Sequence, residues 1–98
     1  MTTWVVSRHP GAVAWLQRRG FKNYHQVAHL DPAGPQPGDV VVGNVPIPLI
    51  AALTERGVAY YHLIVPVTLE RRGAELSCEE LNRLGARLER FEVRRLSI

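Results

Sequence analysis

The sequence contains very little cysteine and very little lysine, and both shortages exclude classes of protein. Cys78 is the only cysteine, so neither an intrachain disulfide nor a cysteine-ligated metal cluster can form. Lys22 is the only lysine among twelve Lys and Arg residues, so the chain lacks the lysine-rich runs of a nonspecific duplex-DNA binder. No apolar run approaches the roughly 18 residues that span a bilayer, and no basic-then-apolar signal segment opens the chain. We therefore expect a soluble, cytoplasmic protein.

The common catalytic signatures are missing as well. The sequence has no glycine-rich P-loop, no paired carboxylates at a fixed spacing and no histidine metal motif. These motifs therefore suggest no particular reaction, and we expect no cofactor.

The composition of the chain is that of a small globular protein with an anionic partner. Its 98 residues, of which 46% are hydrophobic, predict one domain, residues 1–98, with a single core. The net charge of +3 comes almost entirely from arginine, which suits bidentate contacts with phosphates. Enrichment of arginine by a GC-rich genome is the alternative explanation of this bias.

Residues 3–15 combine a buried strand, a polar turn and the start of a helix. The apolar and β-branched residues 3–6 favour a strand, and Pro10 suits the first position of a helix, where its missing N–H costs nothing. Between them stand a hydroxyl, a guanidinium and an imidazole, from Ser7, Arg8 and His9. In open α/β sheets anionic ligands bind at such a turn, between the carboxyl end of a strand and the amino end of a helix.

The first helix is predicted to be short, with one apolar stripe. Ala12, Trp15 and Leu16 fall at positions i, i+3 and i+4, and a glycine after two arginines supplies a left-handed cap. Gly11 permits close approach of another backbone or of a ligand. We expect Trp4 and Trp15 in the core, with base stacking as the alternative.

A second strand, turn and helix repeat this plan within residues 39–57. The strand 39–44 ends in a small polar turn, and Pro46 starts an apolar helix that a glycine ends. A third strong strand is predicted over 58–67. Two strand-turn-helix units imply parallel crossovers, and hence a mainly parallel sheet flanked by helices.

The remaining segments are loops, a weaker strand, a helix and a final strand. Residues 31–38 hold three prolines and two glycines and form a loop, and residues 68–76 form a charged loop. Ser77 and Glu80 form a capping box that starts the last helix, and residues 91–98 alternate as an edge strand would. The weaker strand has Val27, Ala28 and Leu30 as its predicted core, flanked by His25 and His29, and the last helix has Leu81, Leu84 and Leu88 on one face. The resulting order, β-α-β-β-α-β-α-β, predicts a Rossmann-like α/β fold.

Polar residues end two of the predicted strands, and one more lies within a third; if the first two strands are neighbours, the residues that end them meet at one rim of the sheet. They are Ser7, Arg8 and His9 after the first strand, Gly43 and Asn44 after the second strong strand, and His62 within the third. Such a site is rich in donors and poor in acids, which suits a phosphodiester. Each residue also has a structural alternative: Ser7 as a helix cap, Arg8 as a surface charge, His9 in a local turn contact and His62 as a core histidine.

The sequence also resembles a known family over nearly its whole length. The specific part is the turn Ser7-Arg8-His9-Pro10-Gly11-Ala12, and it is supported by 37–43, Tyr61-His62-Leu63 and 72–77. Together these resemble a small accessory protein of type III CRISPR systems. That family is regarded as a dimeric ring nuclease, related in fold to the CARF domain, that degrades the second messenger cyclic tetra-adenylate.

The resemblance implies a function, which we state as an expectation. The protein would bind cyclic tetra-adenylate (cA4) and cleave it without a metal, by attack of a ribose 2′-hydroxyl on the adjacent phosphorus. His9, Arg8 and Ser7 would be catalytic, and the ligand would contact Pro10, Gly11, Gly43, Asn44, His62, Arg71 and Arg72, the last two as a lid. The alternatives are a non-catalytic sensor or sponge of the same nucleotide and an RNA-binding subunit of a CRISPR complex.

Overall fold

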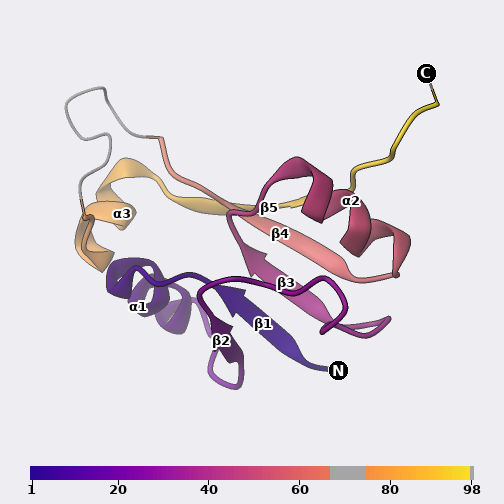
Figure 1. The fold of residues 1–98 in the computed structure, drawn as a ribbon. Coiled ribbons are helices and arrows are strands. Elements are labelled where there is room, and N and C mark those ends of the chain that lie inside the picture. The colour runs from indigo at the N-terminus through magenta and orange to yellow at the C-terminus, as the bar shows by residue number, and fades with distance from the viewer. Residues whose placement is uncertain (67–74, 98) are drawn as a thin grey trace.

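The computed structural model describes residues 1–66 and 75–97 (Figure 1). Within these residues, five strands and three helices follow in the order β-α-β-β-α-β-α-β, which confirms the predicted order. The expected lid residues Arg71 and Arg72 lie outside the described residues. The elements are β1 (Thr3–Val6), α1 (Pro10–Arg18), β2 (His25–Val27), β3 (Val40–Gly43), α2 (Ile47–Glu55), β4 (Ala59–Ile64), α3 (Cys78–Leu84) and β5 (Arg87–Phe91).

The strands form one sheet in the order β2-β1-β3-β4-β5. β1 pairs in parallel with β2 and β3, β3 pairs in parallel with β4, and β5 runs antiparallel to β4. Helices α1 and α2 provide two of the crossovers, and the proline-rich loop 31–38 returns the chain from β2 to β3, on the other side of β1. The prediction of an α/β, mainly parallel sheet is therefore confirmed.

The helices cover both faces of the sheet. In Figure 1, α1 and α3 lie together at the left, and α2 lies at the upper right. The core is correspondingly divided into two clusters, because β3 buries alternate side chains on opposite faces. The cluster beneath α1 and α3 contains Val5, Trp15, Leu16, Val42, Leu63, Cys78, Leu81 and Ala86. The cluster beneath α2 contains Val41, Val45, Ile50, Leu53, Val58 and Tyr60.

Trp15 fixes α1 to α3. Its side chain is 1% exposed, and its indole N–H donates to the side-chain oxygen of Asn82 at 2.9 Å. The guanidinium of Arg19 lies 4.4 Å from the centre of the Trp15 ring on the other side. Trp15 is therefore a core residue, as predicted. Trp4 is half-buried and packs against the cluster beneath α2.

Three predicted boundaries were wrong. β2 consists of residues 25–27, so His25 belongs to it, whereas Ala28 does not. The last helix ends at Gly85, whose φ of 82° is left-handed, and Leu88 therefore lies in β5. The last strand is residues 87–91 rather than 91–98. At α3 the left-handed cap overrides the apolar periodicity on which the prediction was based, and at β5 the pairing with β4 decides the bounds.

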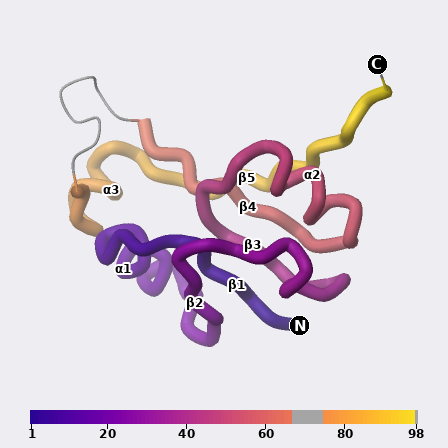
Figure 2. The backbone as a smooth tube through the Cα atoms, viewed as in Figure 1, coloured from indigo at the N-terminus to yellow at the C-terminus, as the bar shows by residue number. Residues whose placement is uncertain are grey.

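Residues 92–97 cross α2 instead of joining the sheet. The Val93 N–H donates to the Thr54 hydroxyl at 3.1 Å, and the Arg95 guanidinium donates to the Glu55 carboxylate at 3.1 Å. Figure 2 shows this segment in yellow, passing α2 at the upper right. Val93 and Arg95 thus contact α2, whereas the apolar Leu96 is exposed.

Asp39 joins the start of β3 to the start of β1. It is 7% exposed, and its carboxylate accepts from the N–H groups of Gln36 and Thr2 at 2.9 Å and from the Trp4 indole at 3.3 Å. The bonds from Gln36 and then Thr2 lower the pKa of Asp39 below its ordinary value. The buried carboxylate is thus fully hydrogen-bonded in its ionised form.

The substitution Asp39→Asn is expected to destabilise the protein at neutral pH, because an amide NH₂ would face one of these three donors. Since the folded pKa of Asp39 is lowered, the contribution of its carboxylate is complete above about pH 4 and is lost as the pH falls further. Urea midpoints should therefore differ between wild type and variant at pH 7, and converge below pH 4. Asp31→Asn, on an exposed loop, is the control. A gap that did not depend on pH would contradict the assignment.

Candidate functional site

The carboxyl ends of three strands lie at one edge of the sheet. Val6 of β1 pairs with Gly43 of β3, and Gly43 pairs with His62 of β4. A Cβ atom on Gly43 would lie 2.6 Å from the carbonyl oxygen of Val6, so only glycine lets β1 and β3 approach this closely here. The expectation that these residues meet at one rim is therefore correct for the backbone.

The turn between β1 and α1 is held by its own backbone and by β2. The Ser7 N–H donates to Val27 O at 3.1 Å, and Gln26 Nε2 donates to Ser7 O at 3.0 Å. Ser7 Oγ accepts from the N–H of His9, the N-cap residue, at 3.2 Å. Ser7 therefore stabilises the turn, and it does not cap α1 through a helical N–H.

The amino end of α1 has no side-chain cap and no acidic residue in its first turn. Pro10 occupies the first position, and the first helical hydrogen bond runs from Val13 N to His9 O. The N–H groups of Gly11 and Ala12 precede that bond, at the positive end of the helix dipole. These groups are the kind of donors that bind a phosphate.

Gly11 also has a packing role. A Cβ atom at this position would overlap the carbonyl oxygen of Leu76, in the segment that leads into α3. The close approach that a glycine was expected to permit is thus to another backbone. The segment 75–77 lies against the start of α1 for this reason.

That close packing places Glu75 beside His9. His9 Nδ1 lies 3.0 Å from Glu75 Oε1, and the two side chains are 65% and 69% exposed. The contact engages Nδ1, so Nε2 is the ring nitrogen that remains for a ligand. The sequence predicted a site poor in acids; Glu75, 66 residues away along the chain, adds one carboxylate to it.

Arg8 is exposed at the same turn. Its guanidinium has no hydrogen bond or ion pair with any residue in the described part of the chain. By contrast, Arg18 and Arg95 pair with Glu79 and Glu55. Arg8 is therefore a cation available to an anionic ligand.

His62 lies at the same edge, on the side of the sheet that α2 covers. Its Nδ1 is 2.8 Å from the hydroxyl of Tyr60, and its Nε2 is 3.4 Å from Nδ2 of Asn44. The ring also meets that of Phe91 edge-on, with the centres 6.0 Å apart. Asn44 is held in place by its second hydrogen bond, from Nδ2 to Leu63 O at 2.9 Å. The structure thus joins Asn44 and His62, two of the predicted site residues.

Tyr60 is the residue at the centre of this network that the sequence did not single out. It is 1% exposed, and its hydroxyl donates to Gly43 O at 2.9 Å and accepts from Val45 N–H at 3.1 Å. Burial raises the pKa of the Tyr60 phenol, so the hydroxyl remains protonated at neutral pH. The adjacent Tyr61 faces the opposite cluster, and only the strand register distinguishes the two.

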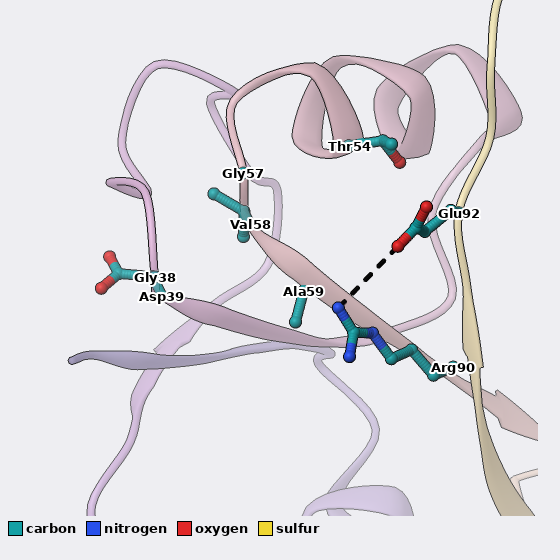
Figure 3. Close-up of a pocket in the computed structure, with 8 residues that line it drawn as sticks. All are labelled: Gly38, Asp39, Thr54, Gly57, Val58, Ala59, Arg90 and Glu92. Carbon is teal, nitrogen blue, oxygen red and sulfur yellow. Dashed lines mark ion pairs between the residues drawn. The ribbon is translucent and has the colours of Figure 1, made fainter.

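A pocket of about 290 Å³ lies at the other edge of the sheet, where β3 and β4 begin (Figure 3). Arg90 and Glu92 point toward one another across it, with 3.9 Å between Nη2 and Oε1. Asp39 and Thr54, which also line it, use their side chains to hold the fold. None of the predicted site residues that the structure describes lines this pocket, so it is separate from the described part of the candidate site.

Two further features of the described residues concern function. Among residues 1–66 and 75–97, no group of three His, Cys, Asp or Glu side chains is placed to hold a metal ion. In the same part of the chain, no helix combines the length and apolar character needed to cross a bilayer.

Comparison with known proteins identifies a family. Residues 4–94 match the model of the family described as "Putative CRISPR-associated protein (Cas_VVA1548)". No curated protein and no solved structure matches the chain. The match covers β1 to β5, including the turn at Arg8 and His9 and the edge at Asn44 and His62. On this evidence the chain belongs to that family of CRISPR-associated proteins.

Proposed function

We propose that this protein is a ring nuclease that binds cyclic tetra-adenylate at the carboxyl edge of β1, β3 and β4 and cleaves its 3′–5′ phosphodiesters. Cleavage of this messenger would switch off type III CRISPR antiviral signalling. One observation carries the proposal: the edge combines a guanidinium that has no partner among the described residues, a helix amino end without a side-chain cap, and two imidazoles. Membership of a CRISPR-associated family agrees with a ligand of this kind.

The donors at the edge suit a phosphodiester in particular. Arg8 offers a planar pair of N–H groups, and the amino end of α1 offers backbone N–H groups at the positive end of a dipole. Among the described residues, the Glu75 carboxylate is directed to His9 and the Glu89 carboxylate to Arg87, so neither would oppose the phosphate directly. A ligand with four phosphates in a ring would use such donors repeatedly.

The proposed cleavage needs the substrate's own ribose 2′-hydroxyl to be aligned with the phosphorus, and it needs no external nucleophile. A ribose 2′-hydroxyl in line with the adjacent P–O5′ bond attacks phosphorus and gives a 2′,3′-cyclic phosphate and a free 5′-hydroxyl. Arg8 and the N–H groups near Gly11 would stabilise the negative charge of the phosphorane. Two such cuts convert the ring into linear di-adenylate. Because the nucleophile belongs to the substrate, the reaction as proposed needs no metal.

The direct test is incubation of the purified protein with radiolabelled cyclic tetra-adenylate in EDTA. We expect linear products that end in 2′,3′-cyclic phosphate, resolved by chromatography. Tight binding without products would instead indicate a sensor or sponge of the nucleotide. Binding of single-stranded RNA in preference to the cyclic nucleotide would indicate a subunit of a CRISPR complex. Either outcome would overturn the proposed activity.

The proposal includes a homodimer with the ring on the two-fold axis. One edge of a 98-residue chain is small compared with a four-nucleotide ring, and a second copy would supply the opposite wall of the site. Light scattering should therefore give twice the mass of the chain, and calorimetric titration should give one ligand per two chains. A monomer that bound one ring per chain would contradict the shared site.

A further inference from the structure

The two histidines at the candidate edge have opposite kinds of partner. His9 contacts a carboxylate, that of Glu75, through Nδ1 at 3.0 Å. His62 contacts a phenol hydroxyl and an amide NH₂, which are both neutral. The two imidazoles therefore have different surroundings, and the neutral partners of His62 allow its tautomer to be assigned.

The protons around Tyr60 determine which tautomer of His62 fits. The hydroxyl of Tyr60 has one proton, and Gly43 O, which can only accept, takes it at 2.9 Å. The Tyr60 oxygen must then accept from both of its other neighbours, Val45 N–H and His62 Nδ1. His62 accordingly carries its proton on Nδ1 and leaves Nε2 as an acceptor.

The contact of His62 with Asn44 agrees with this assignment. One N–H of the Asn44 amide donates to Leu63 O, and the other points to His62 Nε2 over 3.4 Å, a long and weak bond. The contact at Nδ1 is partly buried, whereas that at Nε2 is exposed. The acceptor nitrogen of His62 is thus the one directed to the surface.

The charged residue paired with His62 across the sheet, Glu89, has an ion-pair partner of its own. Glu89 of β5 lies opposite His62 of β4, and its carboxylate accepts from Arg87 Nε at 2.7 Å. Phe91, also of β5, presents its ring to His62 edge-on, and it brings no charge. The neighbours of His62 on β5 are therefore an ion pair and an apolar ring.

From this geometry we infer that His62 is the general base of the reaction and that Tyr60 and Asn44 are its positioning residues; His9, the acid or base expected from the sequence, then takes the complementary role of general acid. The inference rests on the proposed ring nuclease function. The 2′ O–H bond breaks and its proton passes to His62 Nε2, while the 2′ oxygen forms a bond to phosphorus. The P–O5′ bond breaks with its electron pair on O5′, which takes a proton from His9 Nε2. Exchange with water then restores both rings.

A substrate with sulfur in place of the bridging 5′ oxygen separates the two roles, because a thiolate leaves without protonation. On ordinary cyclic tetra-adenylate, His9→Ala and His62→Ala should each slow cleavage by about 100-fold or more. On the thio substrate, His9→Ala should come within about tenfold of wild type, as expected for loss of an acid alone. His62→Ala should remain slow on both. The assignment would be overturned if the thio substrate restored the rate of His62→Ala, or if His62→Ala were fully active on either substrate.

Tyr60→Phe tests the positioning role, with Tyr61→Phe as its matched control on the opposite face. We expect Tyr60→Phe to lower kcat by roughly tenfold with KM unchanged, as for a weakened base, and Tyr61→Phe to leave both unchanged. Nitrogen NMR of the ligand-free protein gives a readout independent of turnover. It should show Nδ1 protonated and Nε2 bare in wild-type His62, and a mixture of tautomers in Tyr60→Phe. A wild-type ring protonated on Nε2 would contradict the inference.

The same experiments distinguish failure of the ring nuclease activity from failure of the general-base role of His62. Wild-type protein that fails to cleave ordinary cyclic tetra-adenylate refutes the ring nuclease and the base together. Wild-type cleavage with an active His62→Ala variant refutes the base alone. Thermal melting of each variant confirms that the comparison is made between folded proteins.

Discussion

His9→Ala is expected to slow cleavage of cyclic tetra-adenylate by about 100- to 10,000-fold, the range for loss of a positioned acid or base. The ring nitrogen Nε2 of His9 is free at the edge, and Glu75 holds Nδ1 at 3.0 Å. Binding should change little, because the phosphate contacts come from Arg8 and from the amino end of α1. Single-turnover rates and calorimetric titration measure the two effects separately.

His29→Ala is the control for His9→Ala, since it removes an exposed imidazole outside the candidate site. It should leave the rate unchanged. A loss of less than about threefold in His9→Ala would move proton transfer away from this residue, to Ser7 or to His62. Glu75→Gln should give an intermediate loss, because the imidazole remains but its carboxylate partner is removed.

Arg8→Ala is expected to weaken both binding and turnover. A hydrogen bond to a charged group contributes about 1.5–3 kcal/mol, which corresponds to a loss of about 10- to 150-fold in affinity. The guanidinium has no partner among the described residues, so its removal should not disturb the fold. Titration calorimetry measures the affinity, and the unfolding midpoint should be that of wild type.

Arg94→Ala is the matched control, because it removes the same charge from the segment that crosses α2, away from the start of α1 (Figure 1). Its effect on affinity should be small and should vanish at high salt. If Arg8→Ala bound and cleaved like wild type, the turn between β1 and α1 would not be the site. An equal loss in both variants would indicate attraction by net charge alone.

Much of the fold was predictable because its signals are local. Strands β1 and β3 are apolar runs ended by a polar turn, and Ser77 with Glu80 forms the predicted capping box. The position of β5 was not predictable in this way. Residues 87–91 lack strict alternation and gain their strand from pairing with β4, whereas the alternating residues 92–97 pack on α2. Tertiary contacts decided the boundary against the local pattern.

The candidate site was predictable only where its residues lie in strands or directly after them. The turn Ser7-Arg8-His9 and Asn44 were placed from the predicted strand ends, and His62 from its position within a predicted strand. Glu75 was not, because its contact with His9 spans 66 positions and no local pattern indicates it. Tyr60 was missed for another reason: it and Tyr61 are equivalent in sequence, and only the face of the sheet decides which one meets His62.

The contact between His9 and Glu75 also has a consequence for the order of folding. This contact joins residues 66 positions apart, and the Trp15–Asn82 hydrogen bond joins residues 67 positions apart. The paired residues of β1 and β3 are separated by only about half as many positions. Closing the longer loops costs more chain entropy, and contacts of this separation form slowly. During synthesis the sheet can begin to assemble before residue 75 has left the ribosome. The nascent chain would therefore begin to assemble its sheet first, and the contact between His9 and Glu75 would form only after residue 75 has emerged.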